Sequence, residues 1–265
     1  VKDPISKFLE TPWRDTFVGI GNINEIPKCL RTNGKVRNLR KSKRETEKLA
    51  KEIWAAKVQL ESKPGSKAQH LADFTHDFLK NRFGVNSAVI EAAYNLIFSC
   101  YKYRFDADCE LFLKIFTGEM NEEVHSEQFK LCRDLETLFG MIDTAANGER
   151  GTGFIEKSEV QTALRAFFYY KKPEKLKELL DAMDEDQAGR LVEWRKVFEE
   201  DRDYNQGAFA EAVRDQFLEE RVEFFRQLEE NTYREARYEE ECDADAFRRA
   251  VQATDPDLNS AAVDR

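Results

Sequence analysis

Apolar side chains recur at helical spacing along most of the 265-residue chain. Ahead of Pro64, the residues Leu49, Ile53, Ala56 and Leu60 follow one another at intervals of four, three and four positions, which places them on one face of a helix. Only 12 glycines and 6 prolines interrupt the chain, so turns are scarce. The pattern predicts an all-α fold and excludes collagen and a β-rich sandwich.

The same pattern divides the chain into segments of different character. Prolines and a Gly-rich stretch predict an irregular N-terminal arm, and phenylalanines at helical spacing predict an aromatic-rich core further on. Near the C-terminus an apolar stripe fades into Glu, Arg and Tyr, which is typical of a solvated or partner-bound helix. The predicted order is an irregular arm (1–34), a basic helix (35–64), a Phe-rich helical block (66–128), a pair of related units (129–200), a long acidic helix (207–254) and a loose tail (255–265).

One motif in the chain carries chemical information. An apolar helix ends at Asp143, and Gly153, Ile155 and Glu159 follow it. A calcium-binding loop needs a glycine at its sixth position for a sharp turn and a carboxylate at its twelfth to bind the ion through both oxygens. An apolar residue at the eighth position pairs with a sister loop. Gly153, Ile155 and Glu159 fit these three positions and predict a helix–loop–helix unit.

A second copy of the motif follows the first. Asp184, Asp186, Gly189 and Leu191 fit positions one, three, six and eight of such a loop. The two glycines at position six, Gly153 and Gly189, lie 36 residues apart, close to the repeat of paired helix–loop–helix units. Two copies at this separation make the signal much more specific than either copy alone.

Residues 129–200 therefore resemble an EF-hand pair of the calmodulin and troponin C superfamily. The resemblance implies an EF-hand-like helical bundle in which the two hands meet through a short two-stranded contact at Ile155 and Leu191. It also implies that the entering aspartates and the final glutamate of the loops are ion ligands. The positions that match those ligands are Asp143, Glu159, Asp184 and Asp186.

The first loop departs from the calcium-binding pattern in its length. Asp143 to Glu159 spans 17 residues, whereas a standard loop has about 12. In the frame counted back from Glu159, Arg150 falls inside the loop, and only a looped-out Asp143 or Asn147 restores an anionic or amide ligand. Because Ca²⁺ takes about six to eight oxygen ligands, we expect this loop to be empty. The alternative is a weak, remodelled Ca²⁺ site in this hand.

The second loop departs in its final ligand. Position twelve is Arg195, or Lys196 if the frame slips by one residue. A positive charge thus replaces the carboxylate that binds the ion through both oxygens, which is unfavourable by Coulomb's law. We therefore predict that neither hand requires a cofactor, and that the fold is kept for packing.

Charge is distributed unevenly along a chain whose net charge is −9. Residues 31–51 hold nine Lys or Arg and two Glu, whereas residues 211–249 hold thirteen acids and seven Arg. The basic stretch either binds an anionic partner surface or pairs with the acidic helix of its own chain. It has no interleaved aromatics and Leu39 as its one apolar anchor, which disfavours nucleic acid and membrane. The predicted partner-binding residues are Arg37, Arg40, Lys41, Lys43 and Arg44, together with Phe217 and Phe224 on the acidic helix.

Enzyme signatures are missing from the sequence, which contains no GxxxxGK[ST], GxSxG or HExxH motif. We therefore predict a non-catalytic, calmodulin-like adaptor that binds partner proteins without calcium. The alternatives are a calcium-responsive sensor that uses the first hand, and a binder of anionic polymers. Five scattered cysteines are typical of a reducing cytoplasm. The order of segments is also similar to that of axonemal proteins of cilia and flagella, which implies a cytoskeletal location with tubulin or a coiled-coil protein as partner.

Overall fold

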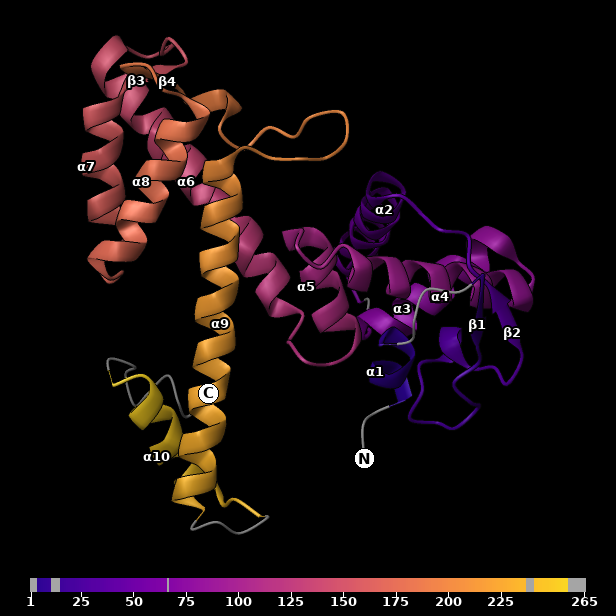
Figure 1. The fold of residues 1–265 in the computed structure, drawn as a ribbon. Helices are drawn as coiled ribbons and strands as arrows, with labels where there is room; N and C mark the ends of the chain where they lie inside the picture. Colours follow the sequence, from indigo (N-terminus) through magenta and orange to yellow (C-terminus); the bar gives the residue numbers. More distant parts are fainter. Residues whose placement is uncertain (1–3, 11–14, 66, 237–240, 257–265) are drawn as a thin grey trace. The chain divides into compact units, whose positions relative to one another are not determined.

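The computed structural model describes residues 4–10, 15–65, 67–236 and 241–256. The chain divides into two compact units, residues 1–212 and 213–265. Helices dominate the described parts, and the strands there form two short two-stranded sheets (Figure 1). This confirms the all-α prediction. Among the described helices, none combines the length and hydropathy that a bilayer crossing requires.

The first half of unit 1 is a helical block built around one central helix. That helix, α4, packs against its neighbours α2, α3 and α5 and buries a nearly continuous run from Ala92 to Cys100. Such burial on all sides is typical of a core helix. The helices are α1 (Pro4–Leu9), α2 (Lys43–Glu61), α3 (Leu71–Phe83), α4 (Asn86–Lys102) and α5 (Ala107–Phe116), and a short η1 (Lys28–Leu30) lies against α3 and α4.

The sequence predicts an irregular arm for residues 1–34. Where the structure describes this arm, it contains the short elements α1, β1 and η1. Strand β1 (Thr16–Val18) pairs antiparallel with β2 (Lys35–Arg37), and Phe17 is opposite Val36. The buried hydroxyl of Tyr94 on α4 donates to the Leu30 carbonyl at 2.9 Å and accepts from the Ile20 amide at 3.0 Å. These bonds fix the arm on the helical block.

The sheet also explains why the expected helix over residues 35–64 is shorter. Residues 35–37 are taken up by β2, and α2 begins only at Lys43. Its start is set by a capping box, in which the Ser42 side chain accepts from the Glu45 amide while the Glu45 carboxylate accepts from the Ser42 amide. This arrangement satisfies two amides that a helix start would otherwise leave without partners.

The second half of unit 1 is a pair of helix–loop–strand–helix units, here called the hand pair (residues 123–198). Strands β3 and β4 pair antiparallel, and their central residues Ile155 and Val192 are opposite one another. The core between the helices is apolar and includes Phe139, Leu164 and Met183. The elements are α6 (Glu123–Asn147), β3 (Phe154–Glu156), α7 (Lys157–Phe167), α8 (Pro173–Asp186), β4 (Leu191–Glu193) and η2 (Trp194–Lys196).

The last long helix, α9 (Ala208–Glu235), begins in unit 1. Phe209 and Ala210 are fully buried there. The Phe209 ring lies 6.3 Å from the Phe139 ring and 5.9 Å from the Phe198 ring, centroid to centroid. The first turn of α9 therefore completes the core of the hand pair.

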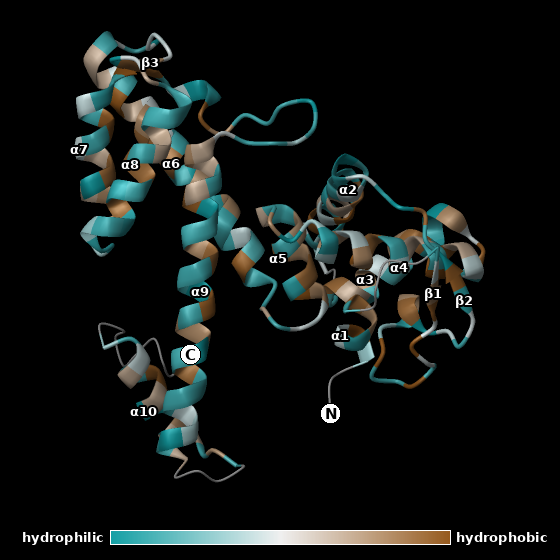
Figure 2. Ribbon diagram, viewed as in Figure 1, coloured by the Kyte–Doolittle hydropathy of each residue, from teal (hydrophilic) through white to brown (hydrophobic). Residues whose placement is uncertain are grey.

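Unit 2 consists of the rest of α9 and of α10 (Ala244–Thr254). Asn231 donates to Thr254 at 3.0 Å, and Arg249 pairs with Glu235 at 2.7 Å. The single helix expected over residues 207–254 is thus two helices, because the Asp243 side chain caps a new helix by accepting from the Ala246 amide. Hydrophilic residues cover much of α9 (Figure 2). The predicted tail (255–265) lies outside the described residues from 257 onward.

Candidate functional site

The first loop of the hand pair closes around the carboxylate of Asp143. This residue lies in the last turns of α6, and it is 1% exposed. Its Oδ1 accepts from Asn147 Nδ2 at 3.0 Å, from the Thr152 amide at 2.8 Å and from the Thr152 hydroxyl at 3.1 Å. Its Oδ2 accepts from the Gly153 amide at 2.7 Å and from Trp194 Nε1 at 2.9 Å. An anion supplied by the chain itself is therefore the group that this loop surrounds.

The surroundings of Asp143 stabilise its charged form. Burial alone raises the pKa of the Asp143 carboxyl, but hydrogen bonds from Thr152, Trp194, Gly153 and Asn147 outweigh burial and hold that pKa well below its ordinary value. The carboxylate is ionised at neutral pH and satisfies donors that would otherwise be left without partners inside the loop.

Two glycines let the loop approach Asp143 this closely. Gly151 and Gly153 have φ angles of +57° and +86°. Residues other than glycine rarely adopt this backbone conformation. A Cβ on Gly151 would lie 2.5 Å from Asp143 Oδ2, and one on Gly153 would lie 3.1 Å from the Arg195 guanidinium. Gly151 thus allows the close approach to Asp143, and Gly153, at position six, allows the approach to Arg195.

The second loop contains a cation that the chain itself provides. The Lys157 ammonium, from the start of α7, donates to the Gln187 carbonyl at 2.5 Å and pairs with Asp184 Oδ1 at 2.8 Å. The Gln187 side chain in turn accepts from the Glu193 amide at 2.6 Å. The Lys157 ammonium therefore contacts two oxygens of the second loop, the Gln187 carbonyl and the Asp184 carboxylate.

The register of the two strands corrects one expectation. The sequence predicts a contact between Ile155 and Leu191, but Ile155 pairs with Val192, and Leu191 is opposite Glu156. Val192 is fully buried whereas Leu191 is 49% exposed, because successive residues of a strand point to opposite faces. Position eight of the second loop is therefore Val192, and position twelve becomes Lys196, which pairs with Glu193 at 2.9 Å.

The five predicted metal-ligating residues lie in four different environments. Asp143 and Asn147 lie together in the first loop, and Asp184 pairs with Lys157. Asp186 accepts from the amides of Ala208 and Phe209 at 2.7 and 2.8 Å, so it caps α9. Glu159 is exposed in the first turn of α7. In this arrangement the set does not fit Ca²⁺, because N–H hydrogens approach the oxygens of Asp143, Asp184 and Asp186 where an ion would have to bind.

Three of the five predicted basic residues, Arg40, Lys43 and Arg44, have side-chain partners within unit 1. Lys43 Nζ lies 2.8 Å from Asp106 Oδ2, 3.3 Å from Glu47 Oε1 and 2.8 Å from Asn205 Oδ1. Arg44 lies 3.5 Å from Asp203 Oδ1, and Arg40 pairs with Asp15. Arg37 is exposed and Lys41 is half-buried. On the acidic helix, Phe217 is buried and Phe224 is half-buried.

Three carboxylates gather beside these lysines. Within the described residues, one group of three or more acidic, His or Cys side chains lies close enough to share an ion, and its members are Glu47, Asp106 and Asp108. Two lysines already contact this group. Lys43 pairs with Asp106, and Lys51 Nζ lies 3.1 Å from Asp108 Oδ2. Glu47 is fully buried. Burial, followed by the facing Asp106 carboxylate, raises the pKa of Glu47 from 4.5 to about 8, against the opposing effect of Lys43.

This raised pKa predicts a pH-dependent stability. Between pH 4.5 and about 8 the folded chain holds a proton on Glu47 that the unfolded chain releases, so the stabilising contribution is present at low pH and is lost as the pH rises. Between pH 5 and pH 8.5 we expect the wild type to lose roughly 1–3 kcal/mol of unfolding free energy relative to Glu47→Gln, in urea titrations. Glu25→Gln, at an exposed position, should keep the wild-type profile. Parallel pH profiles of wild type and Glu47→Gln would contradict the expectation.

The comparisons with known proteins give two relatives. No family model matches the sequence, and no solved structure matches it. The chain is similar to translin-associated factor X-interacting protein 1 of mouse, with 27% identity over 220 residues that cover 82% of this chain and 30% of the relative. It is also similar to the human protein of the same description, with 25% identity over 254 residues that cover 94% of this chain and 36% of the relative. The chain thus spans about a third of the length of these relatives.

Sequence reasoning missed the residues that complete the two loops. Trp194, Thr152, Lys157 and Gln187 supply the internal partners. The weak signal for them is the absence of acidic residues from positions one, three and five of the first loop, counted back from Glu159, and from position twelve of the second. A loop without ion ligands still has inward-facing polar backbone groups, and other side chains of the chain must satisfy those groups.

Proposed function

We propose that the chain is a non-catalytic adaptor that binds a partner protein, and that its hand pair is an EF-hand-like platform held in shape without calcium. The observation that supports the platform best is the Asp143 carboxylate, which accepts five hydrogen bonds inside the first loop. A loop stabilised in this way needs no ion to order it. The rigid pair is then available for binding in every calcium state of its surroundings.

The proposed partner is translin-associated factor X. Both relatives carry that partner in their description, and the human relative aligns with 94% of this chain. We expect the purified chain to form a stoichiometric complex with purified translin-associated factor X in size-exclusion chromatography, and micromolar or tighter binding in calorimetry in the presence of a chelator. Failure to bind at micromolar concentrations would remove this partner from the proposal.

The alternative function is a calcium sensor that uses Asp143, Asn147 and Glu159 of the first hand. Calcium titration distinguishes this sensor from the adaptor. We expect no saturable heat when Ca²⁺ is added to about 1 mM, and the same melting temperature in Ca²⁺ and in chelator. Calmodulin in the same buffer serves as the positive control. A saturable heat together with a raised melting temperature would favour the sensor.

An axonemal location, with tubulin or a coiled-coil protein as partner, remains a prediction from the order of segments along the chain. Of the basic residues, Lys43 and Arg44 have partners on their own chain, and Arg37 is exposed and open to such a partner. Crosslinking mass spectrometry on native material tests it through the lysines of residues 31–51.

A further inference from the structure

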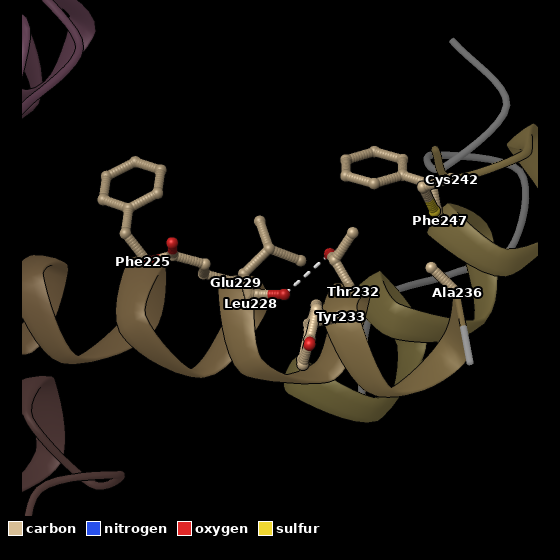
Figure 3. Close-up of a pocket in the computed structure, with 8 residues that line it drawn as sticks. All are labelled: Phe225, Leu228, Glu229, Thr232, Tyr233, Ala236, Cys242 and Phe247. Atoms are coloured by element: carbon tan, nitrogen blue, oxygen red, sulfur yellow. Dashed lines mark hydrogen bonds between the residues drawn. The ribbon is translucent and has the colours of Figure 1, made fainter. Parts of the chain in front are cut away.

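Unit 2 contains an apolar groove of about 390 Å³ between α9 and α10. Figure 3 shows its lining, in which side chains from the last turns of α9 face the same opening as Phe247 and Cys242. The α9 residues follow one another at helical spacing and form a single stripe. The main lining residues are Phe225, Leu228, Glu229, Thr232, Tyr233 and Phe247.

The packing of α10 leaves this stripe open. The fully or nearly buried side chains of α10 are the small ones, Ala246 and Ala250. Phe247, which is next to Ala246, is 45% exposed, while Phe225 and Tyr233 on α9 are 37% and 54% exposed. A groove of this size falls within the range of ligand-binding clefts, about 300–1,000 Å³, and a groove between two helices accommodates the apolar face of a third helix.

The charge around the groove specifies what kind of helix fits. Glu229 lines the groove, and the described residues provide no cationic partner for its carboxylate. The neighbouring arginines Arg226 and Arg249 are not available to Glu229, because they pair with Glu223, Glu230 and Glu235. The groove therefore combines an apolar lining with one glutamate, Glu229, whose carboxylate lacks a cationic partner among the described residues.

We propose that this groove binds an amphipathic helix of a partner protein, with leucine-type side chains on the inner face and lysines or arginines along the flanks. The inference rests on the proposed function as an adaptor and names its docking surface. A second copy of this chain is a poorer occupant, because its basic helix α2 already buries Leu49, Ala50 and Ile53 in its own core.

The test uses the full chain with Cys132→Ser, which removes the one other cysteine that is not buried, and two peptides. One peptide is a helix of about 18 residues with leucines at helical spacing and flanking lysines; the other replaces the lysines by glutamates. Because Cys242 is exposed and lines the groove, binding should slow its alkylation by a maleimide severalfold. We expect protection by the basic peptide and none by the acidic peptide.

Two variants locate the binding in the groove. Glu229→Lys should weaken binding of the basic peptide at least about tenfold, and Phe247→Ala should weaken that binding by a similar factor. Circular dichroism shows whether each variant keeps its helices. Tyr169→Ala, at an exposed aromatic of the hand pair, is the matched control and should change nothing. Equal protection by both peptides, unchanged binding to Glu229→Lys, or a dimer of the chain that Phe247→Ala dissociates would each overturn the proposal.

The outcome is separable from that of the proposed partner. If translin-associated factor X binds the wild type and both groove variants equally well, the groove proposal is wrong while the adaptor function stands. If the basic peptide binds in the groove but translin-associated factor X does not bind the chain, the groove proposal stands and the partner must be another protein.

Discussion

Replacing Phe209 with alanine should lower the free energy of unfolding of unit 1 by about 3–5 kcal/mol. The Phe209 ring is fully buried and packs against Phe139 of α6 and Phe198 beyond η2. Removing it leaves a cavity between elements that are fixed by the strand pair and by the Asp186 cap, so the surroundings can collapse only partly. Urea denaturation followed by circular dichroism measures the change.

The matched control for this variant lies on the same helix. Phe225 is 37% exposed, and Phe225→Ala should cost less than about 1 kcal/mol. A loss below about 1 kcal/mol for Phe209→Ala would mean that the first turn of α9 is not part of the hand-pair core.

The second large effect is expected for Asp143→Ala, which should lower the melting temperature of the chain by about 5–10 °C. The substitution removes the acceptor for the amides of Thr152 and Gly153 and for the Trp194 indole, and buried donors without partners are costly. The loss of the Trp194 hydrogen bond should also shift tryptophan fluorescence. Because hydrogen bonding lowers the pKa of Asp143, its stabilising effect is present at neutral pH and is lost as the pH falls below the ordinary aspartate range.

Two comparisons make this result interpretable. Asp134→Ala, at an exposed position of the same helix, should leave the melting temperature within about 1–2 °C of the wild type. Asp143→Asn keeps one carbonyl acceptor but points an NH₂ group at donors of the loop, so its melting temperature should fall between those of the other two. A wild-type melting temperature for Asp143→Ala would show that the carboxylate does not hold the loop.

The sequence predicts the parts of this fold that depend on local spacing. Helical periodicity finds most of the helices, and the positions of Gly153, Ile155 and Gly189 indicate two related loops. The pairing of Thr16 with Arg37 depends on contacts across an intervening stretch without a hairpin motif, so no local pattern marks it. The end of α9 at Glu235 is equally hard to predict, because the apolar stripe fades into charged residues before the helix ends.

For the candidate site, prediction from the sequence fails for a different reason. Sequence positions reveal that Asp143 is displaced from the ordinary loop frame, but not that its carboxylate faces inward. The inward position of this carboxylate depends on partners as distant in sequence as Trp194. The one-residue difference in strand register has a simpler cause, since Leu191 and Val192 are both apolar and either could face the core.

The partners of the two loops come from opposite hands. Trp194, which follows the strand of the second hand, bonds to Asp143 of the first, and Lys157, which follows the strand of the first hand, reaches Asp184 and Gln187 of the second. Each loop thus depends on a side chain of the other hand. A substitution in one hand should therefore change the loop of the other hand, so the sequences of the two hands constrain each other.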